Sequence, residues 1–129
     1  MNPISPRLRT GTIGELLVQL RLLQFDVQAA PPLKDSGNDL IAVHGCALRA
    51  IQVKTRVTDS YSASDLPKYY HILALVHLVR NREKLYLDKS NVFLIPKEKV
   101  STANRKFSNL NDFLLTRKLV ESLFKPRNS

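Results

Sequence analysis

The sequence has almost no cysteine, no long hydrophobic run and no linker-like stretch. Cys46 is the only cysteine, so the chain can form neither an intrachain disulfide nor a cluster of thiolate ligands around a metal. Any metal must therefore bind oxygen or imidazole. The N-terminal segment 1–10 lacks the apolar middle of a secretory signal, and no apolar run reaches the length of a transmembrane helix. We expect a cytoplasmic protein that does not contact a membrane.

Length and composition favour a single folded unit. The chain has 129 residues, of which 43% are hydrophobic, enough for one compact core and too few for two. It contains no internal repeat and no low-complexity segment. The sequence therefore predicts one domain over residues 1–129.

Acidic residues are also scarce. The chain carries 20 Lys and Arg against 11 Asp and Glu, which gives a formal net charge of +9 and a pI near 10.0. This balance is typical of proteins that bind nucleic acid, so a polyanion is the expected partner. The residues that we expect to contact its phosphates are Arg56, Arg80, Arg82 and Lys84. The alternative is a solvated basic surface without a partner.

The hydrophobic pattern predicts a sheet built on a hairpin, with helices beside it. Residues 12–24 are apolar on nearly every side, which indicates a helix packed on more than one face. Two apolar runs around Gly45 indicate a β-hairpin. The expected strands are 25–29, 39–44, 47–56, 70–79, 84–87 and 91–95, with a loop or short helix at 58–68 and an amphipathic helix at 111–124. The predicted fold class is α/β, or α+β, with a mixed sheet.

Four polar residues lie where this pattern predicts apolar surroundings: Glu15, Asp39, Gln52 and Lys54. Two of them have ordinary structural explanations, since Thr12 and Glu15 have the spacing of a helix capping box and Asp39 is a common turn residue. Gln52 and Lys54 share one face of their strand and are harder to explain. A lysine in a strand interior costs desolvation unless an anionic partner lies close.

Together these residues have the chemistry of a metal site that acts on phosphate. Asp39 and Gln52 fall opposite each other in the predicted hairpin, and Mg²⁺ prefers oxygen ligands. The expected ligands are the Asp39 carboxylate, the Gln52 amide oxygen and the Val53 carbonyl. Glu15 would join them directly or through a water, and Lys54 would hold the attacking water and stabilise charge on the phosphate. These residues predict hydrolysis of a phosphodiester bond.

The order of the motifs resembles the PD-(D/E)XK nuclease superfamily, which includes Holliday-junction resolvases. The motifs are GxxxE at 11–15, GND at 37–39 and QxK at 52–54. The resemblance implies a restriction-endonuclease-like αβββαβ core, here with an extra C-terminal helix, and cleavage of DNA with Mg²⁺ or Mn²⁺. By analogy it also implies a homodimer. Position by position, Glu15 is similar to the helix acid, Asp39 to the principal metal ligand, Gln52 to the second ligand and Lys54 to the motif lysine.

The sequence departs from the family pattern at two positions. Asn38 stands where the motif begins with Pro, and Gln52 stands where Asp or Glu is usual. An amide oxygen is neutral and binds Mg²⁺ less tightly than a carboxylate. Two functions are therefore open. One is a metal-dependent DNA endonuclease, with a structure-specific junction resolvase as one form of it. The other is a catalytically silent nucleic-acid-binding module of the same fold. The presence of Glu15, Asp39 and Lys54 together favours the enzyme.

Overall fold

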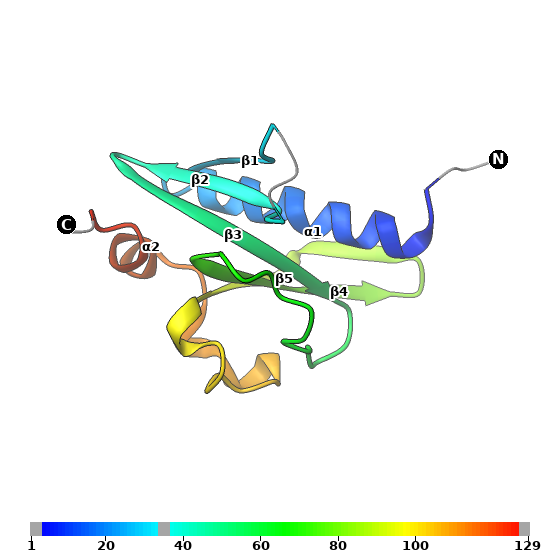
Figure 1. Ribbon diagram of the computed structural model, residues 1–129. Coiled ribbons are helices and arrows are strands. Elements are labelled where there is room, and N and C mark those ends of the chain that lie inside the picture. The colour runs from blue at the N-terminus through cyan, green and yellow to red at the C-terminus, as the bar shows by residue number, and fades with distance from the viewer. Residues whose placement is uncertain (1–3, 34–36, 127–129) are drawn as a thin grey trace.

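The computed structural model describes residues 4–33 and 37–126 of the chain. Its described part has two helices, five strands and three short 3₁₀ turns (Figure 1). In chain order the elements are α1 (Pro6–Leu23), β1 (Gln28–Ala30), β2 (Leu40–His44), β3 (Ala47–Arg56), β4 (Ile72–Asn81), β5 (Lys84–Pro96), η1 (Lys97–Lys99), η2 (Phe107–Asn109), η3 (Asn111–Phe113) and α2 (Arg117–Leu123).

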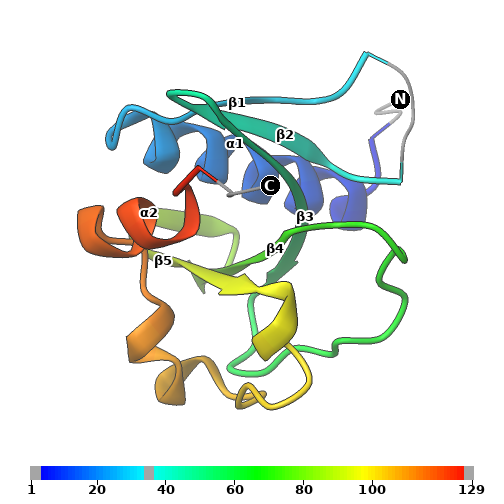
Figure 2. The same ribbon diagram turned by 60° about the vertical axis from the view of Figure 1, so that its left-hand side comes forward.

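The strands form one mixed sheet in the order of the sequence, β1-β2-β3-β4-β5. β3 and β4 are parallel, and the other neighbouring pairs are antiparallel. α1 lies along one face of the sheet, and α2 lies at one end of the molecule (Figure 1, Figure 2). The predicted fold class, α/β with a mixed sheet flanked by helices and an additional C-terminal helix, is confirmed.

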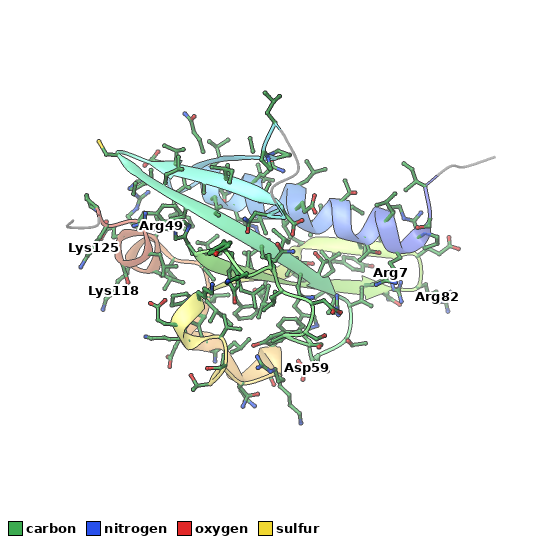
Figure 3. The ribbon with its side chains drawn as sticks, in the orientation of Figure 1. Arg7, Arg49, Asp59, Arg82, Lys118 and Lys125 are labelled. Carbon is green, nitrogen blue, oxygen red and sulfur yellow. The ribbon has the colours of Figure 1, made fainter. Side chains whose placement is uncertain are left out.

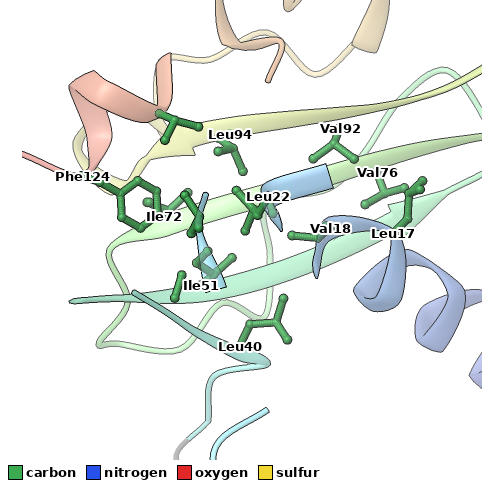
Figure 4. Packing of buried hydrophobic residues seen from close by; sticks show 14 of the residues in the cluster. Leu17, Val18, Leu22, Leu40, Ile51, Ile72, Val76, Val92, Leu94 and Phe124 are labelled. Atoms are coloured by element: carbon green, nitrogen blue, oxygen red, sulfur yellow. The ribbon is translucent and has the colours of Figure 1, made fainter. Parts of the chain in front are cut away.

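The main hydrophobic core lies between α1 and the sheet. Leu17, Val18 and Leu22 of α1 are almost fully buried and contact a cluster of strand side chains. Figure 4 shows this cluster, whose labelled strand members are Leu40, Ile51, Ile72, Val76, Val92 and Leu94. Each such side chain contributes about 1.5–3 kcal/mol when it leaves water. This packing holds α1 across the strands and so fixes which of its residues reach the hairpin.

The opposite face of the sheet has its own core, covered by irregular chain. Its buried members are Tyr61, Tyr70, Leu73, Leu75, Phe93, Ile95, Val100, Phe107 and Leu110. Segment 57–71, which joins the parallel strands β3 and β4, crosses this face without a helix. The αβββαβ order has a helix in this place, so the element order differs here.

Backbone hydrogen bonds explain the missing helix. The Tyr61 amide donates to the Arg105 carbonyl (3.1 Å), and the Phe107 amide donates to the Asp59 carbonyl (2.9 Å). Because buried backbone groups must find partners, pairing with a distant segment replaces pairing within a helix. The polar stretch 58–68 is therefore a loop, one of the two predicted outcomes.

Helix α1 begins earlier than predicted, at Pro6 instead of Thr12. Ser5 caps it, since its hydroxyl accepts a hydrogen bond of 3.1 Å from the Leu8 amide, and proline is favourable at the first helical position. The Thr12 hydroxyl instead donates to the Leu8 carbonyl (3.0 Å) inside the helix. The predicted capping box of Thr12 and Glu15 is therefore wrong.

The prediction that this helix packs on more than one face is also wrong. Leu16, Leu20 and Leu23 are 58%, 57% and 58% exposed. The described elements cover α1 only on its sheet side, so the remaining leucines stay at the surface. No helix in the described residues is long and apolar enough to cross a membrane.

Gly14 allows α1 to approach β3 closely. A Cβ at Gly14 would lie 1.7 Å from Thr55 Oγ1, a distance at which no side chain fits. Thr55 itself is buried under the helix. The next residue, Glu15, is thereby brought to the edge of the helix–sheet contact, near the hairpin.

The predicted hairpin is present, with β2 and β3 joined through Gly45 at a left-handed φ of 59°. The strand predicted at 70–79 is β4, shifted to Ile72–Asn81. The strands predicted at 84–87 and 91–95 are one continuous strand, β5, with a register irregularity against β4 between His77 and Val79. The strand predicted at 25–29 is the short β1, at Gln28–Ala30.

The C-terminal helix is shorter than the predicted 111–124. Leu114 is extended and forms a bridge with Phe93, so helical structure from η3 cannot continue through it. The α2 helix starts after Thr116, whose hydroxyl accepts a hydrogen bond of 3.2 Å from the Leu119 amide. A cap residue inside the predicted range therefore marks the true start of the helix.

Candidate metal and DNA site

The four polar residues singled out in the sequence come from three elements. Glu15 lies on α1, Asp39 directly precedes β2, and Gln52 and Lys54 lie on β3. All four are partly buried. The antiparallel register of β2 and β3 sets Asp39 opposite Gln52. The fold therefore brings this group together around the start of β2.

The Asp39 carboxylate is held against the backbone of β3. Its Oδ2 accepts a hydrogen bond of 2.8 Å from the Val53 amide, and the Asp39 amide donates to the Ile51 carbonyl (3.1 Å). A hydrogen bond to a carboxylate is stronger than one between neutral groups. The carboxylate is therefore fixed at the backbone position between Gln52 and Lys54.

Glu15 lies close enough to Asp39 for their charges to interact. Burial raises the pKa of Glu15 above its ordinary value, and the negative charge of Asp39 raises it further. The two residues are far apart in the chain, and the packing of α1 on β3 brings them together. Two acids in one partly buried place favour a cation between them.

The side-chain oxygen of Gln52 is buried and has no hydrogen-bond partner among the described residues. Leaving such an acceptor unpaired costs about 1–3 kcal/mol, and most buried polar groups are paired. Asn38 Oδ1 and Thr55 Oγ1 are in the same state. Two of these three oxygens, those of Asn38 and Gln52, belong to residues beside Asp39. This is an arrangement that a bound cation would satisfy.

Lys54 is half-buried on the same strand face as Gln52. Lys54 forms no ion pair with another residue of the ranges 4–33 and 37–126. The ion pair in these ranges joins Arg117 to Asp26 (3.6 Å). An ammonium group in this position can donate hydrogen bonds to an anion or a water. Lys54 follows Val53, whose amide donates to Asp39, so it supplies a positive charge on the strand that holds this carboxylate.

These groups suit a hard divalent cation. The described residues contain no group of three or more His, Cys, Asp or Glu side chains that could hold a metal. Glu15, Asp39 and the Gln52 amide provide oxygen ligands only, which is the chemistry of Mg²⁺ and Mn²⁺. The amide of Val53 already binds Asp39, and the Val53 carbonyl stays a predicted further ligand.

Positive residues gather where the β4–β5 hairpin meets the start of α1. A groove of about 520 Å³ is lined there by Arg9, Thr10, Ile13, Arg80, Arg82, Glu83 and Leu85. Figure 3 shows Arg7 and Arg82 at this end of the molecule, and Lys118 and Lys125 at the other end. We refer to Arg7, Arg9, Arg80 and Arg82 as the basic patch.

The four residues predicted to contact phosphate are not all equally placed. Arg80 and Arg82 line the groove. Lys84 is exposed at the hairpin and lies over the Tyr86 ring, 5.3 Å from its centroid. Arg56 ends β3 and donates a hydrogen bond of 2.8 Å to the carbonyl of the preceding residue. Arg82 and Lys84 also line a second hollow of about 620 Å³ at the hairpin, so three of the four lie together at this end of the sheet.

Sequence reasoning missed Arg7 and Arg9 as members of this patch. The helix was expected to begin at Thr12, which left both arginines in a terminal segment. The pair Ser5-Pro6 was the signal that could have found them, since Ser caps helices and Pro is favourable at their first position. The earlier start puts both arginines on the first turns of α1.

Comparison with known proteins supports the fold of the site. No family model matches the sequence, and no curated protein matches it either. The structure is similar to that of a bacterial homing endonuclease, I-Ssp6803I, with a TM-score of 0.54 and 17% sequence identity. The match covers 79% of this chain and 72% of the other. The chain therefore has a fold also found in a nuclease.

Proposed function

We propose that this protein is a metal-dependent DNA endonuclease of the PD-(D/E)XK type. The observation that carries the proposal is the buried, partnerless oxygen of Gln52 beside the fixed carboxylate of Asp39. A purely structural glutamine would find a donor, whereas a cation would satisfy this oxygen and both acids at once. The raised pKa of Glu15 points to the same need for positive charge.

Two further observations support DNA as the substrate. The structure resembles a homing endonuclease over most of its length. The basic patch supplies a cluster of arginines at the end of the molecule where α1 begins, and arginine binds phosphate in a well-defined geometry. Phosphate contacts of this kind position a duplex without reading its bases.

Each residue then has a defined task. Asp39, Gln52 and Glu15 would hold Mg²⁺ or Mn²⁺, with the Val53 carbonyl as a further ligand. When bound, the metal supplies charge stabilisation at the scissile phosphate and eases deprotonation of the attacking water. Lys54 donates hydrogen bonds to that water or to a phosphate oxygen, and so stabilises the charge that develops there.

A plasmid assay tests the proposal. Purified protein is incubated with supercoiled plasmid, single strands and four-way junctions, in Mg²⁺, Mn²⁺ or chelator. We expect nicking only with metal, and we expect it to be lost in Asp39→Ala and in Lys54→Ala. A preference for the four-way junction would mark a resolvase.

Matched controls separate the site from the rest of the surface. Asp88→Ala and Lys118→Ala remove an exposed acid and an exposed base elsewhere, and both variants should cut like the wild type. Activity that survives in Asp39→Ala would contradict the proposal.

A catalytically silent nucleic-acid-binding module is the second candidate, because Gln52 is a neutral residue where the motif has an acid. In that case all of the substrates would bind and none would be cut with any metal. The proposal also includes pairing of two copies, which sedimentation of the free protein measures, and a location in the cytoplasm.

A further inference from the structure

Helix α1 contains two glycines, and packing explains only one of them. A Cβ at Gly14 would lie 1.7 Å from Thr55 Oγ1, whereas a Cβ at Gly11 would meet nothing within 4 Å. Both glycines lie inside the helix Pro6–Leu23. Glycine is the least favourable helix residue after proline, because it loses the most conformational freedom on folding. Gly11 therefore destabilises the helix, and no close approach of another described residue requires a glycine there.

Gly11 lies in a hollow on the surface of α1. The hollow measures about 390 Å³ and is lined by Ser5, Arg7, Leu8, Gly11, Thr12 and Glu15. It contains one residue of the basic patch, Arg7, and one acid of the candidate metal site, Glu15. Gly11 and Glu15 are one helical turn apart on the same side of the helix. The hollow thus connects the two parts of the candidate site.

Each hydroxyl group in this hollow makes one hydrogen bond within the helix. Ser5 Oγ accepts a hydrogen bond of 3.1 Å from the Leu8 amide, and Thr12 Oγ1 donates one of 3.0 Å to the Leu8 carbonyl. The groups left for a ligand are the Ser5 O–H, which still has its proton to donate, the Arg7 cation, the exposed Leu8 side chain, the Glu15 carboxylate and the bare backbone at Gly11. A cation beside a surface without a side chain suits a sugar–phosphate backbone, which needs charge and close approach.

We propose that the sugar–phosphate backbone of bound DNA passes over Gly11 on its way to the acidic residues. This inference rests on the proposed function and assigns a path to its substrate. Gly11 and Glu15 are about 6 Å apart along the helix axis. With a rise of about 3.4 Å per nucleotide, the backbone at Gly11 lies one or two nucleotides from the position at Glu15. Gly11 keeps this path clear.

A second copy of the chain is the alternative partner for this exposed surface of α1. The local charge disfavours it at this place, because a second copy here would bring its own basic patch against Arg7 and its neighbours; pairing through another surface is not affected. DNA carries the opposite charge.

Two variants of equal size test the path. Gly11→Gln and Gly11→Glu add similar bulk and differ by one charge. Binding of a labelled duplex is measured by fluorescence anisotropy in chelator, so that cleavage plays no part. We expect Gly11→Gln to bind about tenfold more weakly, the effect of one lost contact to a charged group, and Gly11→Glu to bind more weakly still.

Two controls show that folding is intact and that position matters. Gly11→Ala should melt at a higher temperature than the wild type, since alanine favours the helix and has room there. Gln24→Glu adds the same negative charge at the exposed far end of α1, and its affinity should stay within about twofold because that charge is screened by salt.

The outcomes separate this inference from the proposed function. If Gly11→Gln and Gly11→Glu bind like the wild type while the wild type cuts DNA, the path is wrong and the endonuclease stands. If the wild type cuts nothing but binds, and Gly11→Glu abolishes binding, the path stands without the enzyme. If Gly11→Gln changes the mass of the free protein in sedimentation and leaves DNA affinity intact, a second copy occupies the hollow and the inference is overturned.

Discussion

At the scale of single residues, Gln52 decides between a metal site and an ordinary polar strand position. Its side-chain oxygen is buried beside Asp39 and lacks a partner in the described part of the chain. In a strand that merely tolerates a polar residue, such an oxygen would accept a hydrogen bond. The two interpretations predict opposite effects of adding a charge at this position.

We therefore predict that Gln52→Glu increases the effect of metal on stability. In chelator its melting temperature should fall below that of the wild type, because a third carboxylate joins Glu15 and Asp39. With Mg²⁺ it should rise by more than the wild type does, since a charged ligand replaces a neutral one and metal that binds only the folded state stabilises it. Thermal melts of both proteins in Mg²⁺ and in chelator measure this.

The control for this prediction is Gln24→Glu, at an exposed position, which should leave the metal response unchanged. Equal metal-induced shifts in the wild type and Gln52→Glu would rule out Gln52 as a ligand.

Glu15 makes stability depend on pH in a direction that its environment sets. Burial and the charge of Asp39 raise its folded pKa above the ordinary 4.5. The folded state therefore binds this proton more tightly than the unfolded state. The stabilisation is fully present below the unfolded pKa and is lost as the pH rises through the folded pKa.

We predict that Glu15→Gln removes the loss of stability that Glu15 causes as the pH rises. In chelator, its melting temperature should exceed that of the wild type by a margin that grows as the pH rises from the ordinary pKa of 4.5 through the raised folded pKa of Glu15. Glu121→Gln, at an exposed position on α2, should show no such trend. A margin that is constant over this range would show that Glu15 ionises without cost in the folded protein.

At the scale of elements, the contact between α1 and β3 assembles the site. Gly14 lets the helix lie directly on Thr55, and Glu15 follows at the edge of that contact. Because Asp39 is fixed on β3 by the Val53 amide, the distance between helix and strand sets how the two acids meet. A small change in the distance between α1 and β3 would therefore move Glu15 relative to Asp39 and change the candidate metal site.

The two glycines of α1 should respond in opposite ways to the same substitution. We predict that Gly14→Ala lowers the free energy of unfolding by about 1–3 kcal/mol, because the new methyl overlaps Thr55. Gly11→Ala should raise it by about 1 kcal/mol, because it improves the helix and meets no atom. Urea unfolding measures both.

A double variant identifies the cause of the expected loss. Combining Gly14→Ala with Thr55→Ala removes the hydroxyl that the methyl would meet, and should recover part of the stability. If Gly11→Ala and Gly14→Ala change the free energy of unfolding in the same direction, the close approach to Thr55 does not explain Gly14.

At the scale of the whole molecule, charge is distributed unevenly with respect to the fold. Arg7 and Arg82 lie together at one end, while Lys118 and Lys125 lie at the other (Figure 3). The first pair is close to the groove between α1 and the β4–β5 hairpin. Net charge alone would attract DNA to either end. The preference for one end must therefore come from the groove and from the candidate metal site with Glu15 and Asp39.

We predict that the basic patch carries the salt dependence of DNA binding. In chelator, the logarithm of affinity should fall linearly with the logarithm of salt concentration. Replacing Arg80 and Arg82 by Ala should reduce this slope by about two, because about 0.9 counterions are released per phosphate contact. Replacing Lys118 and Lys125 by Ala removes the same charge at the other end and should change the slope little.

The salt series also tests the idea that these contacts carry no sequence information. The loss of Arg80 and Arg82 should weaken binding to all duplex sequences alike. An equal change of slope in the two double variants would mean that charge acts through the whole surface, without a defined patch.

The hairpin and its pairing of Asp39 with Gln52 were predictable because both come from local signals. Alternation of apolar and polar residues defines the two strands, and Gly45 marks the turn, so the register follows. The start of α1 was also encoded locally, in Ser5 and Pro6, but the glycine at position 11 concealed it. Local rules placed the start at Thr12 because glycine has low helix propensity and because Thr12 and Glu15 have the spacing of a capping box.

The sequence by itself determined the fold class, the hairpin and the set of oxygen ligands that the chain can offer, because strand periodicity, turn residues and composition act over short distances. Only the tertiary structure decided that Glu15 meets Asp39, that Gln52 has a buried oxygen without a partner and that Arg9 joins Arg82. Each of these depends on contacts between segments distant in the chain. Such contacts arise when α1 packs on the sheet, and no local pattern encodes that packing.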